Sequence, residues 1–331
     1  MSVEASQRAV PTAKPGSGDK YVSERGIHAI RNGQARRDAG VADASAACRV
    51  VVPAPAGDTF ERVDALVERH GLATVCREAR CPNIGECWNR GTATLMLLGE
   101  VCTRACRFCA VDTGQPRGWT DPAEPFKVAQ TVRTLGLRHV VLTSVNRDDL
   151  PDGGAGHFAA TVRAVRAANA GTSVEVLTPD FQGVAAQVDT VLDAGVDVFA
   201  HNLETVRRLS PDIRDRRAGY DRSLAVLAHA ARHPSRPVVK TSLMLGLGET
   251  GDEVEAAMAD ARGAGVSLLT LGQYLRPTIH HAPIVRRVPE AEFASLRRRA
   301  LDLGFAECVA GPLVRSSYRA DVALAQVRAA R

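Results

Sequence analysis

The chain has 331 residues, of which 45% are hydrophobic and 24% charged, so it can bury one large core or two ordinary ones. Its net charge is +5 and only 4% of its residues are aromatic, which argues against nucleic acid because few side chains could stack on bases. No apolar run approaches the roughly 20 residues of a membrane-spanning helix, and residues 1–50 hold no apolar core of a secretion signal. We therefore expect a cytoplasmic protein without a membrane or nucleic-acid partner.

Two segments are predicted ahead of the main fold. Residues 1–50 are rich in Ala, Gly, Ser and charge without a sustained apolar period, which predicts a flexible or loosely attached extension. Residues 51–91 form the second segment and contain "DTFERVDALVERHG", which predicts a short amphipathic helix ended by Gly71. The apolar face of this helix is made by Phe60, Val63, Leu66 and Val67.

Residues 92–304 alternate between short β-branched runs and helical patterns. The six predicted strands are "TLMLLGEV", "HVVLTSV", "SVEVLTP", "VDVFAHNLE", "VVKTSLMLG" and "SLLTLGQYL". Six strand–helix units predict a parallel sheet, because parallel strands need a crossover and a helix supplies it. Nearly all-apolar strands indicate burial on both faces, which suits a doubly wound open sheet or a barrel, complete or partial.

Polar residues cluster where the predicted strands end. They are residues 143–149, Pro179-Asp180, His201-Asn202, Lys240-Thr241-Ser242 and Gln273-Tyr274. In barrels the chemistry lies at the C-terminal ends of the strands, so this pattern favours a barrel-like arrangement with one active face. Residues 305–331 remain as a C-terminal segment with the motif "RSSY".

Six of the eight cysteines lie in two triplets. The first triplet is Cys76, Cys81 and Cys87, and the second triplet is Cys102, Cys106 and Cys109. Disulfides are disfavoured in a reducing compartment and in a chain of this size. Zinc stays an alternative, although structural zinc sites close with four ligands and no adjacent His completes either triplet. Iron–sulfur clusters accept thiolates at short, irregular spacings, and three thiolates leave one iron open to another ligand.

The second triplet follows the first predicted strand as C-x3-C-x2-C with Phe108 before its last cysteine. This pattern resembles the radical S-adenosylmethionine (SAM) enzymes. The resemblance implies a [4Fe–4S] cluster on Cys102, Cys106 and Cys109 whose open iron binds SAM. Reduction of the cluster would cleave SAM to a 5′-deoxyadenosyl radical, which abstracts hydrogen from unactivated carbon.

The first triplet, C-x4-C-x5-C, narrows the resemblance to the lipoyl synthase family over roughly residues 58–320. The motifs that resemble this family are "TSVNRDDLPDGGA", "TPDFQG", "FAHNLETV", "GLGETGDE", "LTLGQYLRPTIHHAP" and "GPLVRSSY". The resemblance implies a partial (β/α)6 TIM-like barrel with N- and C-terminal extensions covering its open face. It also implies an auxiliary [4Fe–4S] cluster on Cys76, Cys81 and Cys87, with Ser317 as its fourth ligand.

In that family the auxiliary cluster is the source of two sulfur atoms, placed at C6 and C8 of an octanoyl chain on a lipoyl carrier protein or domain. The resemblance implies SAM contacts at Thr143, Ser144 and Asn146, and no catalytic side chain beyond the clusters and SAM. It further implies an electron donor such as ferredoxin or flavodoxin, and an iron–sulfur carrier that restores the auxiliary cluster.

Two alternatives remain open from the residues. One is another radical SAM sulfur inserter, similar to biotin synthase, which normally carries a different second cluster. The other is a non-enzymatic iron–sulfur carrier, which has little use for six strand–helix units with polar loops. His280 and His281 resemble a metal pair, but adjacent residues on a strand point to opposite faces, so we expect loop or substrate-wall residues. Cys48 and Cys308 fit neither triplet and are expected to be a free thiol and a buried small residue.

Overall fold

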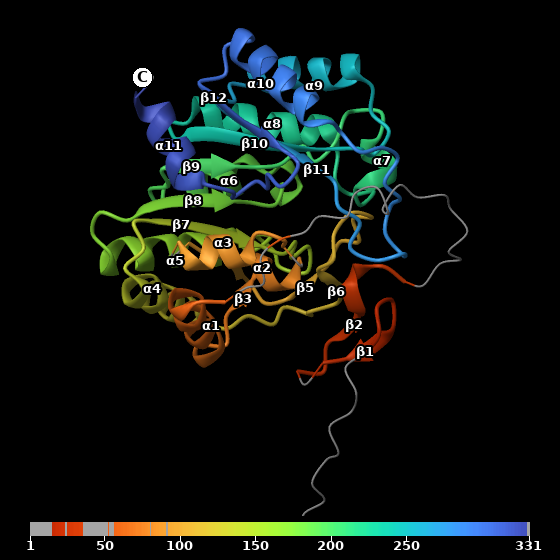
Figure 1. Ribbon diagram of the computed structural model, residues 1–331. Helices are drawn as coiled ribbons and strands as arrows, with labels where there is room; N and C mark the ends of the chain where they lie inside the picture. The colour runs from red at the N-terminus through yellow and green to blue at the C-terminus, as the bar shows by residue number, and fades with distance from the viewer. Residues whose placement is uncertain are drawn as a thin grey trace, which may run out of the picture.

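The computed structural model describes residues 15–23, 25–35, 52, 56–79, 81–90 and 92–329 (Figure 1). In this part of the chain the main sheet has the strand order β12-β11-β10-β9-β8-β7-β4-β3. Its parallel strands are β4 (Thr94–Leu97), β7 (His139–Ser144), β8 (Ser173–Leu177), β9 (Val198–Ala200), β10 (Val238–Leu245), β11 (Leu268–Gln273) and β12 (Glu307–Gly311). The short strand β3 (Ala73–Thr74) pairs antiparallel with β4.

All six predicted strands are present, as β4 and β7 to β11. Every residue of β4 and of β11 is buried, as expected for strands covered on both faces. The prediction of a partial (β/α)6 barrel is confirmed. The sheet also contains β12, a parallel strand that the sequence does not predict. Its sequence "ECVAG" is short and begins with a charged residue, so it shows no strand pattern.

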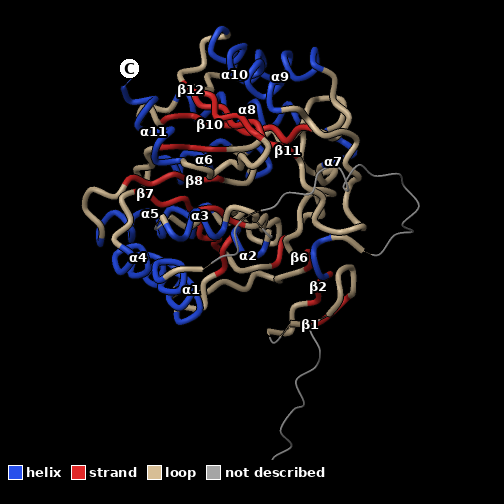
Figure 2. Tube along the Cα trace, viewed as in Figure 1, coloured by secondary structure: helices blue, strands red, loops and turns tan. Residues whose placement is uncertain are grey.

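Helices cover the outer face of the sheet (Figures 1 and 2). They are α4 (Glu124–Leu135), α5 (Ala155–Ala168), α6 (Ala185–Leu192), α8 (Tyr220–Arg232), α9 (Gly251–Gly263) and α10 (Glu290–Asp302), with the short α7 (Ser210–Ile213) and η3 (Phe181–Gly183) between them. Helix α9 begins with a capping box, in which the Thr250 and Glu253 side chains each bond the other's backbone N–H. Helix α4 ends at Gly136, whose φ of 62° is cheap only for glycine. No helix in the described ranges is long and apolar enough to cross a membrane.

The C-terminal helix α11 (Ala320–Ala329) closes the end of the barrel where the strands begin. Its residues Ala323, Leu324 and Val327 form one apolar cluster with the first residues of three strands. Those strand residues are Val198 of β9, Val238 of β10 and Leu268 of β11. Figure 1 shows α11 at the end opposite β5 and β6. The polar strand ends therefore lie at the other mouth of the barrel.

The open side of the barrel is covered by residues 56–79 and 81–90 and by the chain after β12. The predicted helix is present as α1 (Asp58–Arg69), followed by α2 (Val75–Glu78) and α3 (Ile84–Asn89). Asn83 Nδ2 donates to the Leu313 carbonyl at 2.7 Å, and Thr94 Oγ1 donates to Ser317 Oγ at 2.9 Å. These bonds join the two edges of the sheet, which confirms that extensions cover the open face.

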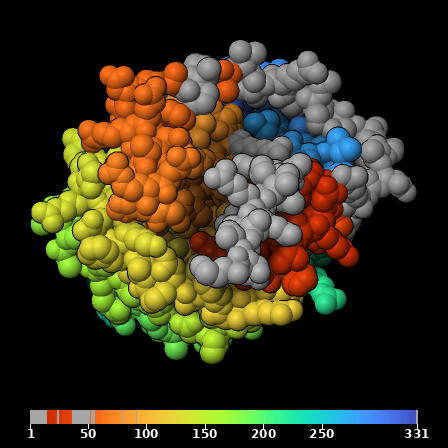
Figure 3. Space-filling model, turned by 90° about the horizontal axis from the view of Figure 1, so that it is seen from below, coloured from red at the N-terminus to blue at the C-terminus, as the bar shows by residue number. Residues whose placement is uncertain are grey.

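The N-terminal segment differs from its prediction. This segment holds β1 (Lys20–Val22) and β2 (His28–Ile30), and β2 continues into η1 (Arg31–Gly33). The two strands join β6 (Asp112–Gly114) and β5 (Val101–Cys102) in a second sheet. Figure 3 shows these strands in red on the same face as residues 56–79 and 81–90 in orange. The expectation of a flexible or loosely attached extension therefore does not hold for residues 15–23 and 25–35. Strands of three residues are too short to show a period, and pairing with β6 decides their structure. Cys48 lies outside the described residues.

Candidate active site

The second triplet begins at Cys102, the last residue of β5, and continues on the loop that follows it, at the C-terminal mouth of the barrel. Backbone N–H groups point at its sulfurs. The amides of Arg104 and Asn146 donate to Cys102 Sγ at 3.4 and 3.3 Å, and the amide of Asp215 donates to Cys106 Sγ at 3.3 Å. Such bonds favour the thiolate form and tune the potential of a cluster that the thiolates hold.

A buried ion cluster anchors this loop to the barrel. The Arg104 guanidinium donates to both carboxylate oxygens of Asp148, at 3.0 and 2.8 Å, and lies 2.8 Å from Asp180 Oδ1. Burial opposes ionisation of both aspartates, but their hydrogen bonds to Arg104 hold the pKa of each below its usual range. The residues after β7 and β8 are thereby tied to the cysteine loop.

The thiols of each triplet lie close enough to affect one another. Burial and the neighbouring Cys102 raise the pKa of Cys106 to about 12, against the opposing Asp215 hydrogen bond. Burial, Cys76 and Cys81 raise the pKa of Cys87 to about 12. Thiols buried in this way ionise only beside a positive charge, and a bound metal would supply such a charge. Within the described residues, no three His, Cys, Asp or Glu side chains gather as a single metal ion requires.

The first triplet lies on α2, on α3 and between them. Cys76 is buried, and Cys81 and Cys87 are partly buried. Arg315, in the segment that closes the open side, lies near Cys81. Burial lowers the pKa of Arg315, and the charge of the Cys81 thiolate opposes that shift. This triplet is thus enclosed between the N-terminal helices and the C-terminal segment.

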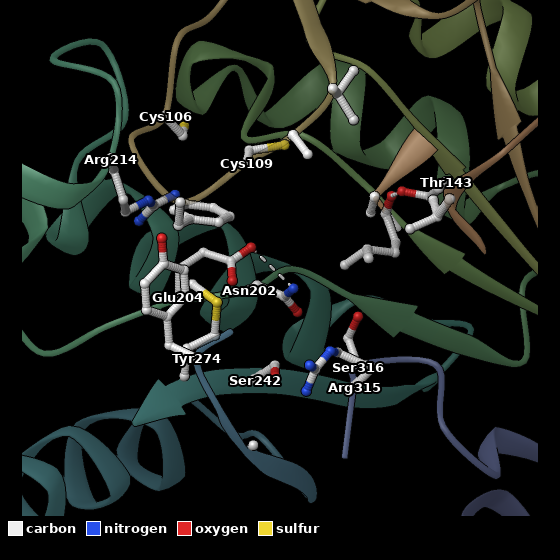
Figure 4. Close-up of a pocket in the computed structure, with 18 of the residues that line it drawn as sticks. Cys106, Cys109, Thr143, Asn202, Glu204, Arg214, Ser242, Tyr274, Arg315 and Ser316 are labelled. Atoms are coloured by element: carbon white, nitrogen blue, oxygen red, sulfur yellow. Dashed lines mark hydrogen bonds between the residues drawn. The ribbon is translucent and has the colours of Figure 1, made fainter. Parts of the chain in front are cut away.

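A cavity of about 590 Å³ opens beside the second triplet (Figure 4). All three cysteines of the second triplet line it, and so do Val75 and Pro82, which are next to cysteines of the first triplet. Its polar lining from the strand ends includes Thr143, Ser144, Asn146, His201, Asn202, Glu204, Ser242, Gln273 and Tyr274. A mostly apolar cavity with a few convergent polar groups is the usual form of a cofactor or substrate site.

The predicted SAM contacts all line this cavity. Thr143 Oγ1 donates to the Leu177 carbonyl at 2.9 Å, and the Asn146 backbone N–H donates to Cys102 Sγ. Ser144 Oγ is buried without a hydrogen-bond partner in the described structure. A buried hydroxyl without a partner is costly, so Ser144 is suited to receive a polar group of a ligand.

Three further residues of the cavity wall, of which the sequence indicated only Asn202 as a polar strand end, had no predicted role in binding. Asn202 Nδ2 donates to Glu204 Oε1 at 3.1 Å, while Asn202 Oδ1 is buried without a partner among the described residues (Figure 4). Burial raises the pKa of Glu204, and the nearby Arg214 opposes the shift. Asn202 and Glu204 follow β9 within "HNLE", so the strand-end signal was present in the sequence. Arg214 lies in a loop with no such signal.

The structure separates the two serines of "RSSY". Ser316 lines the cavity beside Arg315 (Figure 4). The hydroxyl of Ser317, the predicted ligand, accepts a hydrogen bond from Thr94 Oγ1 at 2.9 Å, and the Thr94 backbone hydrogen-bonds Cys76. Ser316 therefore faces the cavity, while Ser317 shares a hydrogen-bond partner with the first triplet.

The remaining candidates have structural contacts. His281 is a loop residue, as expected, and its Nε2 lies 3.0 Å from the carbonyl oxygen of Cys109. Cys308 is fully buried in β12, which confirms the expectation of a buried small residue.

Comparison with known proteins agrees with this site. Residues 96–261 match the radical SAM superfamily. The chain is 58% identical over 292 residues to a lipoyl synthase of Deinococcus radiodurans, and the match covers 88% of each chain. It is 54% identical over 295 residues to a lipoyl synthase of Thermus thermophilus, and that match covers 89% of this chain and 91% of the relative. The crystal structure of HydG, a maturase of the [FeFe]-hydrogenase, shares the fold at 12% identity, with a TM-score of 0.52 over 81% of this chain and 58% of that one. The chain belongs to the lipoyl synthase family of radical SAM enzymes.

Proposed function

We propose that this enzyme inserts sulfur at C6 and C8 of an octanoyl chain bound to a lipoyl carrier protein or domain, and that an auxiliary [4Fe–4S] cluster donates the sulfur. The observation that carries the proposal is the single cavity lined by the second triplet and by neighbours of the first. A substrate carbon in that cavity would lie within reach of both a radical source and a sulfur source. The apolar part of the lining, including Met96, Leu177 and Met244, suits an alkyl chain.

Cys102, Cys106 and Cys109 would hold the SAM-binding cluster. When bound, this cluster and SAM supply a radical able to take hydrogen from unactivated carbon. The N–H groups that donate to Cys102 and Cys106 fit thiolate ligands, and the unpartnered atoms of Ser144 and Asn202 fit a polar cofactor. Thr143, Ser144 and Asn146 remain the proposed SAM contacts, now joined by Asn202.

Cys76, Cys81 and Cys87 would hold the auxiliary cluster, with Ser317 as its fourth ligand. The Ser317 hydroxyl is bonded to Thr94 Oγ1, and the Thr94 backbone also hydrogen-bonds Cys76 of the first triplet, whereas Ser316 lines the cavity. A serine ligand must lose its proton, and its oxygen is a harder ligand than thiolate, so it would leave iron more easily. That property suits a cluster that is taken apart in use. Arg315 adds a positive charge beside Cys81.

The proposal includes three partners that the fold does not identify by itself. They are the octanoylated carrier, an electron donor such as ferredoxin or flavodoxin, and an iron–sulfur carrier that restores the auxiliary cluster. The cytoplasm remains the predicted compartment.

Iron and sulfide content after anaerobic reconstitution tests the proposal. Two cubane clusters predict about eight of each per chain. Incubation with SAM, a reductant and an octanoylated carrier should then yield lipoyl product by mass spectrometry. About four irons per chain without SAM cleavage would instead favour the non-enzymatic carrier. A second cluster that survives Cys81→Ala would favour the biotin synthase-like alternative.

A further inference from the structure

The loop 103–109 is held through its carbonyl groups by two segments far away in sequence. Gln34, which is only 4% exposed, donates its side-chain amide to the carbonyls of Ala105 and Cys106, at 3.2 and 3.1 Å. On the other side, His281 Nε2 lies 3.0 Å from the Cys109 carbonyl, and the Ala282 amide donates to the Arg107 carbonyl at 2.8 Å. A carbonyl can only accept, so His281 carries its proton on Nε2.

The backbone at Gly33, next to Gln34, packs directly against the cysteine loop and the residues after it. Gly33 has a φ of +73°, and a Cβ at this position would come within 2.5 Å of the Val111 carbonyl oxygen and 2.9 Å of the Cys109 carbonyl oxygen. Only glycine allows such an approach of two backbones. The close contact therefore depends on the residue type at position 33.

A buried carboxylate also binds this N-terminal segment by hydrogen bonds. Asp112, at 2% exposure, accepts hydrogen bonds from Tyr21 Oη at 2.5 Å, Arg31 Nη1 at 2.9 Å and the Asn32 amide at 2.7 Å. Asp112 begins β6, the strand that follows the cysteine loop and pairs with β2. The loop and the N-terminal segment are thus one hydrogen-bonded unit.

We propose that residues 31–34, which we call the strap, and His281 are positioning residues that hold the second triplet in the geometry its cluster needs to bind SAM. The inference rests on the proposed assignment of Cys102, Cys106 and Cys109 to the SAM-binding cluster. Both the strap and His281 lie outside residues 96–261, which match the radical SAM superfamily, so the barrel alone does not supply these contacts. Groups that orient metal ligands from behind control how the metal site performs.

Gln34→Ala and Gln34→Glu test the strap, with Lys20→Ala as a control on an exposed residue of β1. Gln34→Ala removes the side-chain amide that donates to the two carbonyls. Gln34→Glu places a carboxylate, which only accepts hydrogen bonds, opposite the same two carbonyls. Hydrogen exchange on the full-length chain, before clusters are loaded, should quicken roughly fivefold or more across residues 103–113 in both variants, because two hydrogen bonds are lost. Lys20→Ala should match the original protein.

The reconstituted enzyme supplies the second readout. The change that SAM causes in the electron paramagnetic resonance spectrum of the reduced cluster should weaken in both variants, and the KM for SAM should rise more than kcat falls. Exchange that stays at the original rate in residues 103–113, exchange that quickens over the whole chain, or an unchanged SAM-dependent spectrum would each overturn the inference. The hydrogen-exchange result does not depend on assigning Cys102, Cys106 and Cys109 to the SAM-binding cluster. That assignment is tested separately and would be wrong if Cys106→Ala still cleaved SAM.

Discussion

The two cysteine triplets are enclosed in different ways. The second triplet is anchored by buried charge: Arg104, Asp148 and Asp180 form an ion cluster with side-chain exposures of 3%, 16% and 0%. The first triplet is closed by the C-terminal segment, whose ion pair between Arg319 and Glu86 is 49% and 42% exposed. Exposed pairs contribute little to stability, whereas loss of one member of a buried pair is costly.

This difference matches the two proposed roles. A cluster that cleaves SAM in every turnover must keep one geometry, and a buried network over-determines the loop that carries it. A cluster that donates its sulfur must be taken apart and replaced. Its enclosure is held by the hydrogen bonds of Asn83 and Thr94 and by an exposed ion pair, which together cost less to break than a buried ion cluster. The four predictions below test this contrast in order of expected effect.

The largest effect is expected from substitutions of the triplets themselves. Cys106→Ala should abolish formation of 5′-deoxyadenosine, because the SAM-binding cluster loses one of its three thiolates. Cys81→Ala should keep SAM cleavage and lose lipoyl product, because the sulfur source is lost. Both products should be quantified together under anaerobic conditions with a reductant. Cleavage lost in Cys81→Ala but kept in Cys106→Ala would invert the assignment.

Arg104→Met should destabilise the folded protein by about 3–5 kcal/mol, because Asp148 and Asp180 lose their shared buried partner and keep only the longer contacts to Arg217 and Arg222. Urea unfolding measures this change, and Arg319→Met is a control that removes an exposed arginine. The pKa of Asp148 and of Asp180 is lower in the folded than in the unfolded state. These carboxylates therefore stabilise the fold fully above the usual aspartate pKa, and this stabilisation is lost as the pH falls through their folded-state pKa. Arg104→Met should therefore flatten the acid side of the stability profile. An unchanged profile would show that Arg104 does not hold these carboxylates.

Ser317→Ala should lower the yield of lipoyl product by about tenfold or more, with SAM cleavage preserved, because the auxiliary cluster loses its proposed fourth ligand. Ser316→Ala is the matched control, since its side chain lines the cavity. Mass spectrometry of the carrier measures product for both variants. Full product from Ser317→Ala with loss in Ser316→Ala would assign the ligand to Ser316 instead.

The smallest effect is expected at the exposed closure of the first triplet. Glu86→Gln removes the ion pair with Arg319 and should cost about 0.2–1 kcal/mol, a difference that shrinks at high salt. Paired urea titrations at low and high salt measure it. A cost as large as that of Arg104→Met would contradict the contrast between the two enclosures.

Local patterns in the chain were enough to predict much of the barrel. Its six strands follow from apolar β-branched runs, and the helix at 58–71 follows from its period, because both signals lie within a few consecutive residues. The cysteine spacings and the polar strand ends likewise indicated the cavity, since parallel strands bring their C-terminal ends to one edge.

Other features depend on groups that are distant in sequence. The strands β1 and β2 pair with each other and β2 pairs with β6, while β12 pairs with β11, although none of these strands has a strong pattern of its own. The neighbouring residues Ser316 and Ser317 have the same side chain, so no local rule distinguishes them, and only the fold turns one toward the cavity and the other toward Thr94. Sequence by itself determined which residue types were available for the clusters. Tertiary structure decided which of them meet, because hydrogen bonds and ligation depend on distances that the chain order does not contain.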